Sequence, residues 1–293
     1  MSVINTNVSA TITSNALAKN DRAMSQSMER LSTGQRINSA SDDAAGLAIA
    51  SKMTSQIRGL DQAVRNGNDA ISMIQTADGA LVEVSNMLQR MRELSVQAAS
   101  DTNTATDRDA LDIEFQALED QIDVISSNTQ WNGVNLLDGE LGAVAFQVGA
   151  NASQTISVTF ADLNTSQGTA SATLSLAGVF TTLDGSTAGD DLETLDLQDK
   201  ANATTSITQV DKAIENINAH RATLGSTINR IEYAVDNLAN VSQNATASRS
   251  RVQDANYATE STELARTQII QQAGTAMLAQ ANQQSQSVLA LLK

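Results

Sequence analysis

Apolar residues recur along two long stretches of the chain in alternating steps of three and four. One stretch holds Ile207, Val210, Ile214, Ile217, Leu224, Ile228, Ile231, Val235 and Leu238, and only Arg221 interrupts it. An earlier stretch holds Ile57, Leu60, Val64, Ile71, Ile74, Leu81, Val84, Leu88, Met91, Leu94 and Ala98. This spacing keeps one stripe of a helix facing a partner helix over several heptads. The two stripes can meet only if the chain goes out and comes back, which favours a structural, self-associating protein over an enzyme with a pocket.

The same pattern predicts where the helices begin and end. Two long helices are expected at about 57–100 and 199–247, and the first follows an irregular polar connector at 34–56. The sequence Thr106-x-x-Asp109 resembles a capping box, which would start another helix. The apolar stripe of that helix consists of Leu111, Phe115, Leu118, Ile122 and Ile125.

Both ends of the chain carry weaker helical patterns. Residues 1–33 have a sparse apolar stripe, which would make a marginal helix alone in water. A polar stretch at 248–256 leads into a final helix that ends near Leu292. The polar face of this last helix is mostly Gln, Asn, Ser and Thr, whereas a helix on a membrane surface would carry Lys and Arg there. We therefore expect the final helix to pack against other protein helices.

The middle of the chain has a period of about two residues. Val144, Phe146 and Val148 alternate with smaller or polar residues, and the sequence near 156–160 repeats this pattern, so a β-hairpin is expected near 143–160. Asn132-Gly133 is a turn dipeptide, as is Asp138-Gly139. The predicted fold class is mainly α, with long antiparallel coiled-coil helices formed by the N- and C-terminal regions and a small central region that contains the hairpin.

Composition supports long helix contacts over one compact core. Aromatic residues make up only 2% of the 293 residues, so stability must come from many repeated small contacts. Proline and cysteine are both absent, which removes the commonest cause of a helix break and excludes disulfides and thiol sites. No run of about 18 apolar residues predicts a membrane-spanning helix, and the first residues do not resemble a signal peptide. Taken alone, these features would indicate a cytoplasmic protein.

The negative charge is concentrated in the central third. Residues 109–199 contain 15 Asp and Glu and no Lys or Arg, whereas the rest of the chain has 18 acidic and 18 basic residues, so this segment carries the whole net charge of −15. An acidic surface repels nucleic acid and anionic lipid, so neither is expected as a partner. A solvated surface explains the charge most simply. A calcium site using Asp190, Asp191 and Glu193 is the alternative, although the spacing is not that of an EF-hand.

Candidates for catalysis are few. The one histidine, His220, lies beside Arg221 on a predicted long helix, where an ordinary surface or packing role is expected. Phosphate-binding loops, zinc-binding HExxH pairs and nucleophile elbows do not occur. The paired carboxylates at 42–43 and 190–191 are residues that helix starts and turns commonly use. The sequence therefore predicts a protein that is not an enzyme and needs no cofactor or metal.

Several segments closely resemble bacterial flagellins. The segment ERLSTGQRINSA at 29–40, followed by DDAAGLAI at 42–49, matches their N-terminal motif, and so does INTN at 4–7. The segments NTQWNG at 128–133 and AGTAMLAQAN at 273–282 also match. The resemblance covers about residues 1–140 and 200–293, and motifs of this length are specific. The chain resembles a short flagellin.

The resemblance implies a division of the chain into domains. Residues 1–40 and 255–293 would form the inner helical core of a filament, and residues 41–164 and 197–254 would form a coiled-coil domain. Residues 165–196 would form a short variable outer segment, in place of the larger outer domains of longer flagellins. The acidic middle would then face outward in the filament. Leu278, Val288, Leu289 and Leu292 would be buried when subunits assemble.

The resemblance also implies partners and a location. The subunit would polymerise with itself into a helical homopolymer for motility, outside the cell, after export without a cleavable signal peptide. Its other partners would be the flagellar export apparatus, an export chaperone, the filament cap and the hook-junction proteins. Many flagellins are sensed by an innate immune receptor with leucine-rich repeats. By resemblance to the segment LQRMRELSVQ at 88–97, the contact residues would be Arg90, Leu94 and Glu114.

Two other functions remain open from the sequence. A hook–filament junction protein is also built on helical ends, but the matches at 29–49 and 273–282 favour flagellin. A cytoplasmic coiled-coil adaptor would be folded at its ends as a monomer and would need no acidic, outward-facing middle. An enzyme with an acidic site is a third and weaker alternative.

Overall fold

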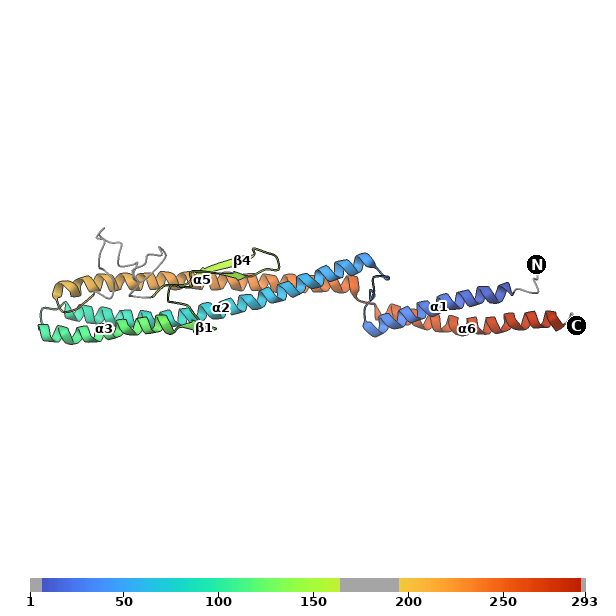
Figure 1. Ribbon diagram of the computed structural model, residues 1–293, viewed down its shortest axis with the longest axis horizontal. Coiled ribbons are helices and arrows are strands. Elements are labelled where there is room, and N and C mark those ends of the chain that lie inside the picture. The colour runs from blue at the N-terminus through green and yellow to red at the C-terminus, as the bar shows by residue number, and fades with distance from the viewer. Residues whose placement is uncertain (1–6, 164–194, 291–293) are drawn as a thin grey trace. The chain divides into compact units, whose positions relative to one another are not determined.

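The computed structural model describes residues 7–163 and 195–290, and for residues 284–290 it describes the backbone alone. The chain forms long helices α1 (Val8–Thr33), α2 (Ala44–Ala98), α3 (Ala105–Asn128), α5 (Lys200–Gln253) and α6 (Tyr257–Ala290) (Figure 1). Two short strand pairs, β1–β2 and β3–β4, lie between α3 and α5 in the sequence. The predicted fold class, mainly helical with a small hairpin-containing middle, is confirmed.

The chain divides into two compact units. Residues 1–58 and 242–293 form the terminal unit, and residues 59–241 form the central unit. The predicted limits of the filament domains, such as 1–40 with 255–293, concern the assembled state and stay a prediction. Most of the predicted variable segment, 165–196, lies outside the described residues.

Helices α2, α3 and α5 build the core of the central unit. Their contacts run in opposite order along α2 and α5, because Arg92 pairs with Asp211, Asp78 pairs with Arg221, and Gly67 faces Val235. The two helices are therefore antiparallel, as the two apolar stripes predicted. The largest completely buried side chains include Leu81, Leu88, Met91 and Leu94 of α2 and Phe115 and Ile122 of α3.

The apolar stripe of α5 passes through His220 rather than stopping at Arg221. Ile217 and Leu224 are 2% and 1% exposed, and His220, three residues after the first and four before the second, is 4% exposed. Arg221 lies beside the stripe, where its Nε donates a hydrogen bond to Asp78 Oδ1 at 2.8 Å. Helical periodicity puts one residue of the buried stripe between Ile217 and Leu224, and that residue is His220.

Helix α2 begins at Ala44, so the connector predicted at 34–56 is wrong over its second half. The Asp43 side chain accepts a hydrogen bond from the Gly46 backbone N–H at 2.8 Å, which satisfies an otherwise unpaired donor of the first turn. A Cβ on Gly46 would come within 2.6 Å of Ile37 Cδ1 and 2.5 Å of Asp43 Oδ2. Gly46, which lies within the predicted connector, therefore allows close packing inside a helix.

Helix α3 has a capping box two residues earlier than predicted. Asp107 N–H donates to Thr104 Oγ1, and the Asp107 carboxylate accepts from the Thr104 backbone N–H at 2.9 Å. These hydrogen bonds with the Thr104 side chain and backbone lower the pKa of Asp107. The predicted box from Thr106 to Asp109 is therefore wrong, although the helix that follows has the predicted stripe, with Phe115 and Ile122 buried.

The two predicted turns and the hairpin are present. Strands β1 (Gln130–Trp131) and β2 (Val134–Asn135) pair across Asn132-Gly133, whose φ angles of 51° and 79° suit a tight hairpin turn. Strands β3 (Ala143–Gln147) and β4 (Thr155–Thr159) form the antiparallel hairpin expected near 143–160. Val158 and Phe160 are buried in the central unit.

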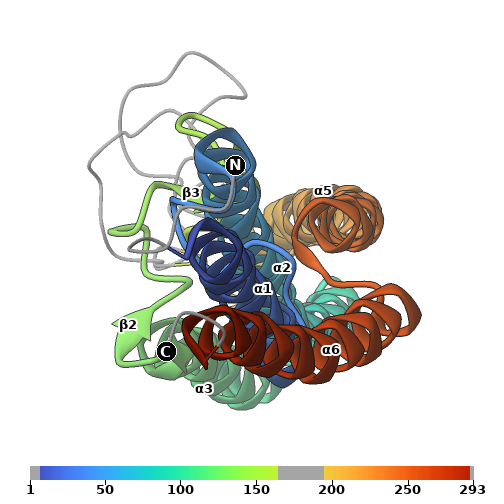
Figure 2. The ribbon, with the colours of Figure 1, turned by 90° about the vertical axis from the view of Figure 1, so that its right-hand side faces the viewer.

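Helix α5 continues to Gln253, so the break predicted over 248–256 is reduced to three residues. Asn256 then starts α6, with its side-chain oxygen accepting from Ala258 N–H at 3.1 Å. In the terminal unit α6 lies beside α1 (Figure 2). Asn7 contacts Ala281 and Arg30 contacts Glu260, so these two helices are also antiparallel.

Candidate assembly and recognition surfaces

The charged residues assigned to a receptor by resemblance lie on neighbouring faces of α2 and α3. Arg90 Nη2 is 2.8 Å from Glu114 Oε1, and Arg90 Nη1 is 3.0 Å from Glu93 Oε2. The Arg90 and Glu114 side chains are 49% and 46% exposed, so solvent and a partner can reach both. Hydrogen bonds to Glu114 and then to Glu93 raise the pKa of Arg90 above its ordinary value. The structure therefore brings Arg90 and Glu114 together on an open surface.

Leu94, the third residue of that set, belongs to the core. It is 1% exposed and lies in the apolar stripe of α2 with Leu88 and Met91. A partner that binds this surface can contact Arg90 and Glu114 while the Leu94 side chain stays buried. Leu94 therefore supports the shape of the surface from below.

Three further ion pairs on the central unit were not predicted. Arg92 pairs with Asp211, Arg221 pairs with Asp78, and Lys200 pairs with Asp101. All six side chains are at least 35% exposed, so each pair contributes little to stability. The first two join α2 to α5 and are consistent with one antiparallel register. In the sequence the residues of these two pairs are visible only as opposite charges on separate helices. Which of them pair can be predicted only when the register of the two helices is known.

The α1–α6 pair joins through polar side chains. Asn20 Nδ2 donates to the Thr267 carbonyl at 2.8 Å and to Gln271 Oε1 at 3.1 Å. Asn7 Nδ2 donates to the Ala281 carbonyl at 3.2 Å. Many of the larger apolar side chains of these helices are exposed, and those of Val8, Ile12, Met28, Ile269, Ile270 and Met277 are between 42% and 67% exposed. Those of Leu17, Met24, Leu31, Leu264 and Leu278 are half-buried.

The structure places only one of the predicted self-assembly residues in detail. Leu278 is half-buried on α6. The side chains of Val288 and Leu289, and all of Leu292, lie outside the described residues. Their burial in an assembly stays a prediction.

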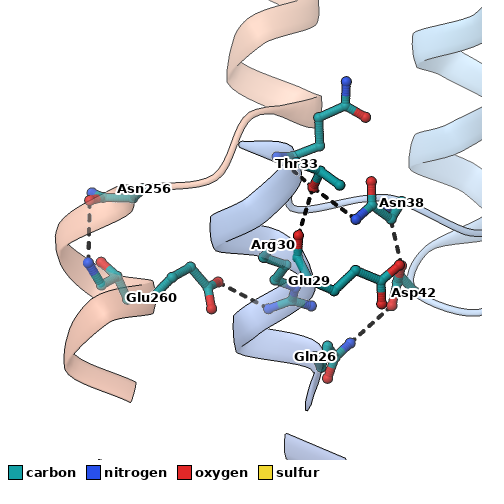
Figure 3. A network of polar contacts seen from close by, with 10 residues as sticks. Gln26, Glu29, Arg30, Thr33, Asn38, Asp42, Asn256 and Glu260 are labelled. Atoms are coloured by element: carbon teal, nitrogen blue, oxygen red, sulfur yellow. Dashed lines mark hydrogen bonds and ion pairs between the residues drawn. The ribbon is translucent and has the colours of Figure 1, made fainter. Parts of the chain in front are cut away.

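Polar contacts also organise the place where the terminal helices meet their linkers (Figure 3). Arg30 Nη1 is 3.1 Å from Glu260 Oε1, and these side chains are 26% and 12% exposed. Gln26 donates to Asp42 Oδ1 at 2.9 Å, and Asn38 donates to Thr33 Oγ1 at 2.8 Å. Hydrogen bonds from the Ser39 backbone, Gln26 and the Asn38 backbone lower the pKa of Asp42. This network links α1 to the start of α2 and to α6.

The segment between α1 and α2 (34–43) and the segment between α5 and α6 (254–256) also contact each other through their backbones. Arg36 N–H donates to the Gln253 carbonyl at 2.7 Å, and Ala255 N–H donates to the Gly34 carbonyl at 2.9 Å. Gln35 and Asp254 form an antiparallel bridge between these bonds. The segments that look irregular in the sequence are therefore paired with each other.

The described part of the chain forms no cluster suited to a metal ion. No three His, Asp or Glu side chains at 7–163 and 195–290 are grouped so that they could hold a metal ion. The alternative calcium ligands, Asp190, Asp191 and Glu193, lie outside these ranges. The described helices also include none that is long and apolar enough to cross a membrane.

Comparison with known proteins decides the family. Residues 4–141 match the bacterial flagellin N-terminal helical region, and residues 207–292 match the bacterial flagellin C-terminal helical region. The chain belongs to the bacterial flagellin family. A flagellin from Halalkalibacterium halodurans is 44% identical over 291 residues, which cover 99% of this chain and 100% of that protein. The flagellin of Bacillus subtilis is 44% identical over 310 residues, which cover 99% of each chain.

Two solved structures are similar to parts of this chain. The crystal structure of Bacillus cereus flagellin has a TM-score of 0.47 and 35% identity, covering 59% of this chain and 88% of that one. A protein described as flagellar hook-associated, from Vibrio parahaemolyticus, has a TM-score of 0.58 and 14% identity, covering 73% of this flagellin and all of that chain. At 14% identity this second likeness concerns the fold alone.

Sequence reasoning missed the buried polar residues of this flagellin. Asp112 is 5% exposed, and its Oδ1 accepts a hydrogen bond from the Leu197 backbone N–H at 2.8 Å. Asn20 and Glu260 are also buried, at 8% and 9% exposure. A polar residue within a helical stripe is the only signal in the sequence, and the many Asn, Ser and Thr residues of this chain obscure it.

Proposed function

We infer that this chain is the structural subunit of a bacterial flagellar filament, which it builds by polymerising with itself into a helix. Family membership supports this inference, because the match covers both helical ends and relatives named flagellin align over 99% of the chain. A subunit of this kind uses a heterologous contact that repeats without closing, which produces a filament. It is a structural protein and not an enzyme.

We propose that the terminal unit supplies the assembly surface. Its apolar side chains, such as Ile12, Met28, Ile269 and Met277, are more than half exposed within one subunit. Large apolar side chains on an exposed face mark a surface that another protein covers. Covering them, together with Leu278, Val288, Leu289 and Leu292, would contribute on the order of 1.5–3 kcal/mol for each side chain that becomes fully buried. Ordering of the helices offsets part of this gain.

Electron microscopy of the purified chain tests this function. Concentrated protein should form helical filaments without any other component. A hook–filament junction protein should give no long filaments under these conditions, and a coiled-coil adaptor should stay as small soluble species. The 44% identity to proteins named flagellin favours the filament, whereas the likeness to a hook-associated protein concerns only the fold. A folded, concentrated chain that never polymerises would contradict the proposal.

We further propose that the subunit leaves the cell through the flagellar export apparatus with the help of an export chaperone. In the assembled flagellum it would meet the filament cap and the hook-junction proteins. Family membership supports these partners. Detection of the chain in sheared extracellular filaments, and its retention inside cells that lack a working export apparatus, would test this location.

Receptor recognition is the remaining proposal. Arg90 and Glu114 form an exposed pair across α2 and α3, and they are the residues that the resemblance assigns to an innate immune receptor. Leu94 would act by supporting the α2 surface rather than by touching the receptor, because it is 1% exposed.

A further inference from the structure

The residues buried between α1 and α6 are all polar. Among the described side chains of these two helices, those less than a tenth exposed are Asn20, Ser27, Glu260 and Thr267. Two antiparallel helices with an apolar stripe are aligned by interlocking large side chains. Among the described side chains of α1 and α6, no large apolar one is less than a tenth exposed, so apolar packing fixes their register less firmly than a fully buried stripe would.

Polar contacts between α1 and α6 indicate one register for the pair. Asn7 contacts Ala281, Asn20 contacts Thr267 and Gln271, and Arg30 contacts Glu260, so the partners descend along α6 as the residues ascend along α1. The contact of Asn20 is central and buried, and its amide is 2.8 Å from a backbone carbonyl. Backbone carbonyls recur at every turn of α6, so the register-specific partner is the Gln271 side chain. Sliding α6 by one turn, about 5.4 Å, would move Gln271 Oε1 away from this amide.

We propose that Asn20 determines the register in which α1 and α6 pair, and thereby the specificity of assembly. A buried asparagine in a helix–helix stripe selects one alignment at a cost in stability, because other alignments separate its amide from a side-chain partner. The consequence for assembly rests on the proposed function. The register of the pair decides where Ile12 and Met28 of α1 lie relative to Ile269 and Met277 of α6, and these are the side chains a second copy would cover.

The chain is well suited to a direct measurement of register, because it has no cysteine. A Cβ added at Gly274 would lie 3.1 Å from Leu17 Cγ, so Leu17→Cys with Gly274→Cys places two thiols within disulfide reach in the observed register. Leu17→Cys combined with Leu278→Cys or with Ile270→Cys reports a shift of about one turn in either direction. The ratio of native to shifted cross-link, after mild oxidation of both the soluble and the pelleted protein, measures the register preference.

Asn20→Leu should lower this ratio about tenfold, as expected when the hydrogen bond between a buried amide and the Gln271 side chain no longer favours one register. Asn20→Ala should lower it in the same direction, which separates the loss of the amide from the added bulk of leucine. Asn15→Leu, at an exposed position of α1, is the matched control and should keep the parental ratio. Filaments formed by the Asn20→Leu chain should be shorter or irregular.

The possible outcomes are distinct. If Asn20→Leu and Asn20→Ala both keep the parental cross-link ratio, Asn20 does not determine the register. If the ratio falls equally with Asn15→Leu, the effect belongs to added leucine and the proposal is also overturned. Failure of the parental chain to form filaments would count against the proposed function, while the ratio in the soluble protein would still measure the register.

Discussion

The central and terminal units of this flagellin are built from similar long helices but hold together differently. In the central unit, α2, α3 and α5 bury leucine, isoleucine, methionine and phenylalanine side chains completely. In the terminal unit, the described side chains of α1 and α6 that are buried are four polar ones, and the larger apolar ones are half-buried or exposed. Burial of apolar area is the main stabilising contribution in folding. The central unit can therefore be stable alone, whereas the terminal pair needs a further surface to cover it.

The terminal and central units also differ in net charge. The terminal unit, 1–58 with 242–293, has 10 basic and 7 acidic residues, whereas the central unit has 8 basic and 26 acidic ones. Their formal charges are therefore +3 and −18. Like charges brought together within a Debye length of about 8 Å repel each other at physiological salt. The nearly balanced terminal unit can approach other copies more closely than the acidic central unit.

The largest expected effect comes from removing α6. Deletion of residues 257–293 should abolish polymerisation, because it removes the exposed apolar side chains of α6, such as Ile269 and Met277. The central unit should stay folded, because its core lies within 59–241. Sedimentation would measure assembly, and circular dichroism would measure melting of the remaining helices. We also expect α1 and α6 to be largely disordered in the free monomer, because their pairing leaves no large described apolar side chain fully buried. They should pair there only transiently, so oxidation of the soluble protein traps these transient pairs and reports their register. If the truncated chain still forms filaments, or if its central helices unfold when α6 is removed, the proposed difference between the central and terminal units is wrong.

Core truncations should separate the two units next. Leu88 is completely buried in the central unit, so Leu88→Ala should lower the free energy of unfolding by about 2–5 kcal/mol. Ile12 is 64% exposed on α1, so Ile12→Ala should change the stability of the monomer by less than about 0.5 kcal/mol while it weakens polymerisation. Urea denaturation of the monomers and the critical concentration for assembly provide the two measurements. Equal stability losses would show that the terminal pair is as well packed as the core.

Two glycines of the central unit refine the picture of its packing. A Cβ at Gly67 would lie 2.5 Å from Val235 Cγ2, so Gly67→Ala should destabilise the α2–α5 contact by about 1–3 kcal/mol. A Cβ at Gly225 meets no neighbour within 4 Å, so Gly225→Ala should stabilise α5 by about 0.5–1 kcal/mol. Thermal unfolding of both variants against the parent would measure these opposite signs. A stabilising Gly67→Ala would show that α2 and α5 are not closely packed there.

Acid should weaken the central unit through His220. Burial lowers the pKa of this imidazole below its ordinary value of 6.5, and a hydrogen bond with the Phe160 backbone only partly opposes this shift. The unfolded chain therefore binds the proton first as the pH falls below about 6.5. The contribution of His220 to the free energy of unfolding should be complete above that pH and should fall as the pH approaches the folded-state value. Urea denaturation of the parent and of His220→Gln from pH 8 to 5 gives the difference between their free energies of unfolding, in which the effect of the carboxylates cancels. If this difference stays constant over the pH range, His220 does not contribute as expected.

The smallest effect on folding is expected at Arg90. Arg90→Ala removes exposed ion pairs with Glu114 and Glu93 and introduces a good helix former, so helix content should hardly change. Binding of the monomer to a leucine-rich-repeat receptor should weaken, if this chain is sensed by one. Arg65→Ala, at an exposed arginine on the same helix, is a matched control. Unchanged receptor activation by folded Arg90→Ala monomer would reject the role assigned to this residue.

The sequence alone determined the elements whose signals are local or periodic. The apolar stripes of α2, α3 and α5 follow from steps of three and four, since a helix turns once in 3.6 residues. Asn132-Gly133 specified its hairpin turn, because both residues tolerate positive φ angles. The motifs at both ends indicated the family. These features need no knowledge of which residues meet across the fold.

The tertiary structure decided which polar side chains become partners. Nothing local in the sequence aligns Arg92 with Asp211 or distinguishes Asn20 from the exposed Asn15. His220 completes an apolar stripe because packing against the rest of the central unit buries whichever residue the helical turn places there. The strength of a polar contact depends on distance, burial and register, and these exist only after distant segments of the chain have come together.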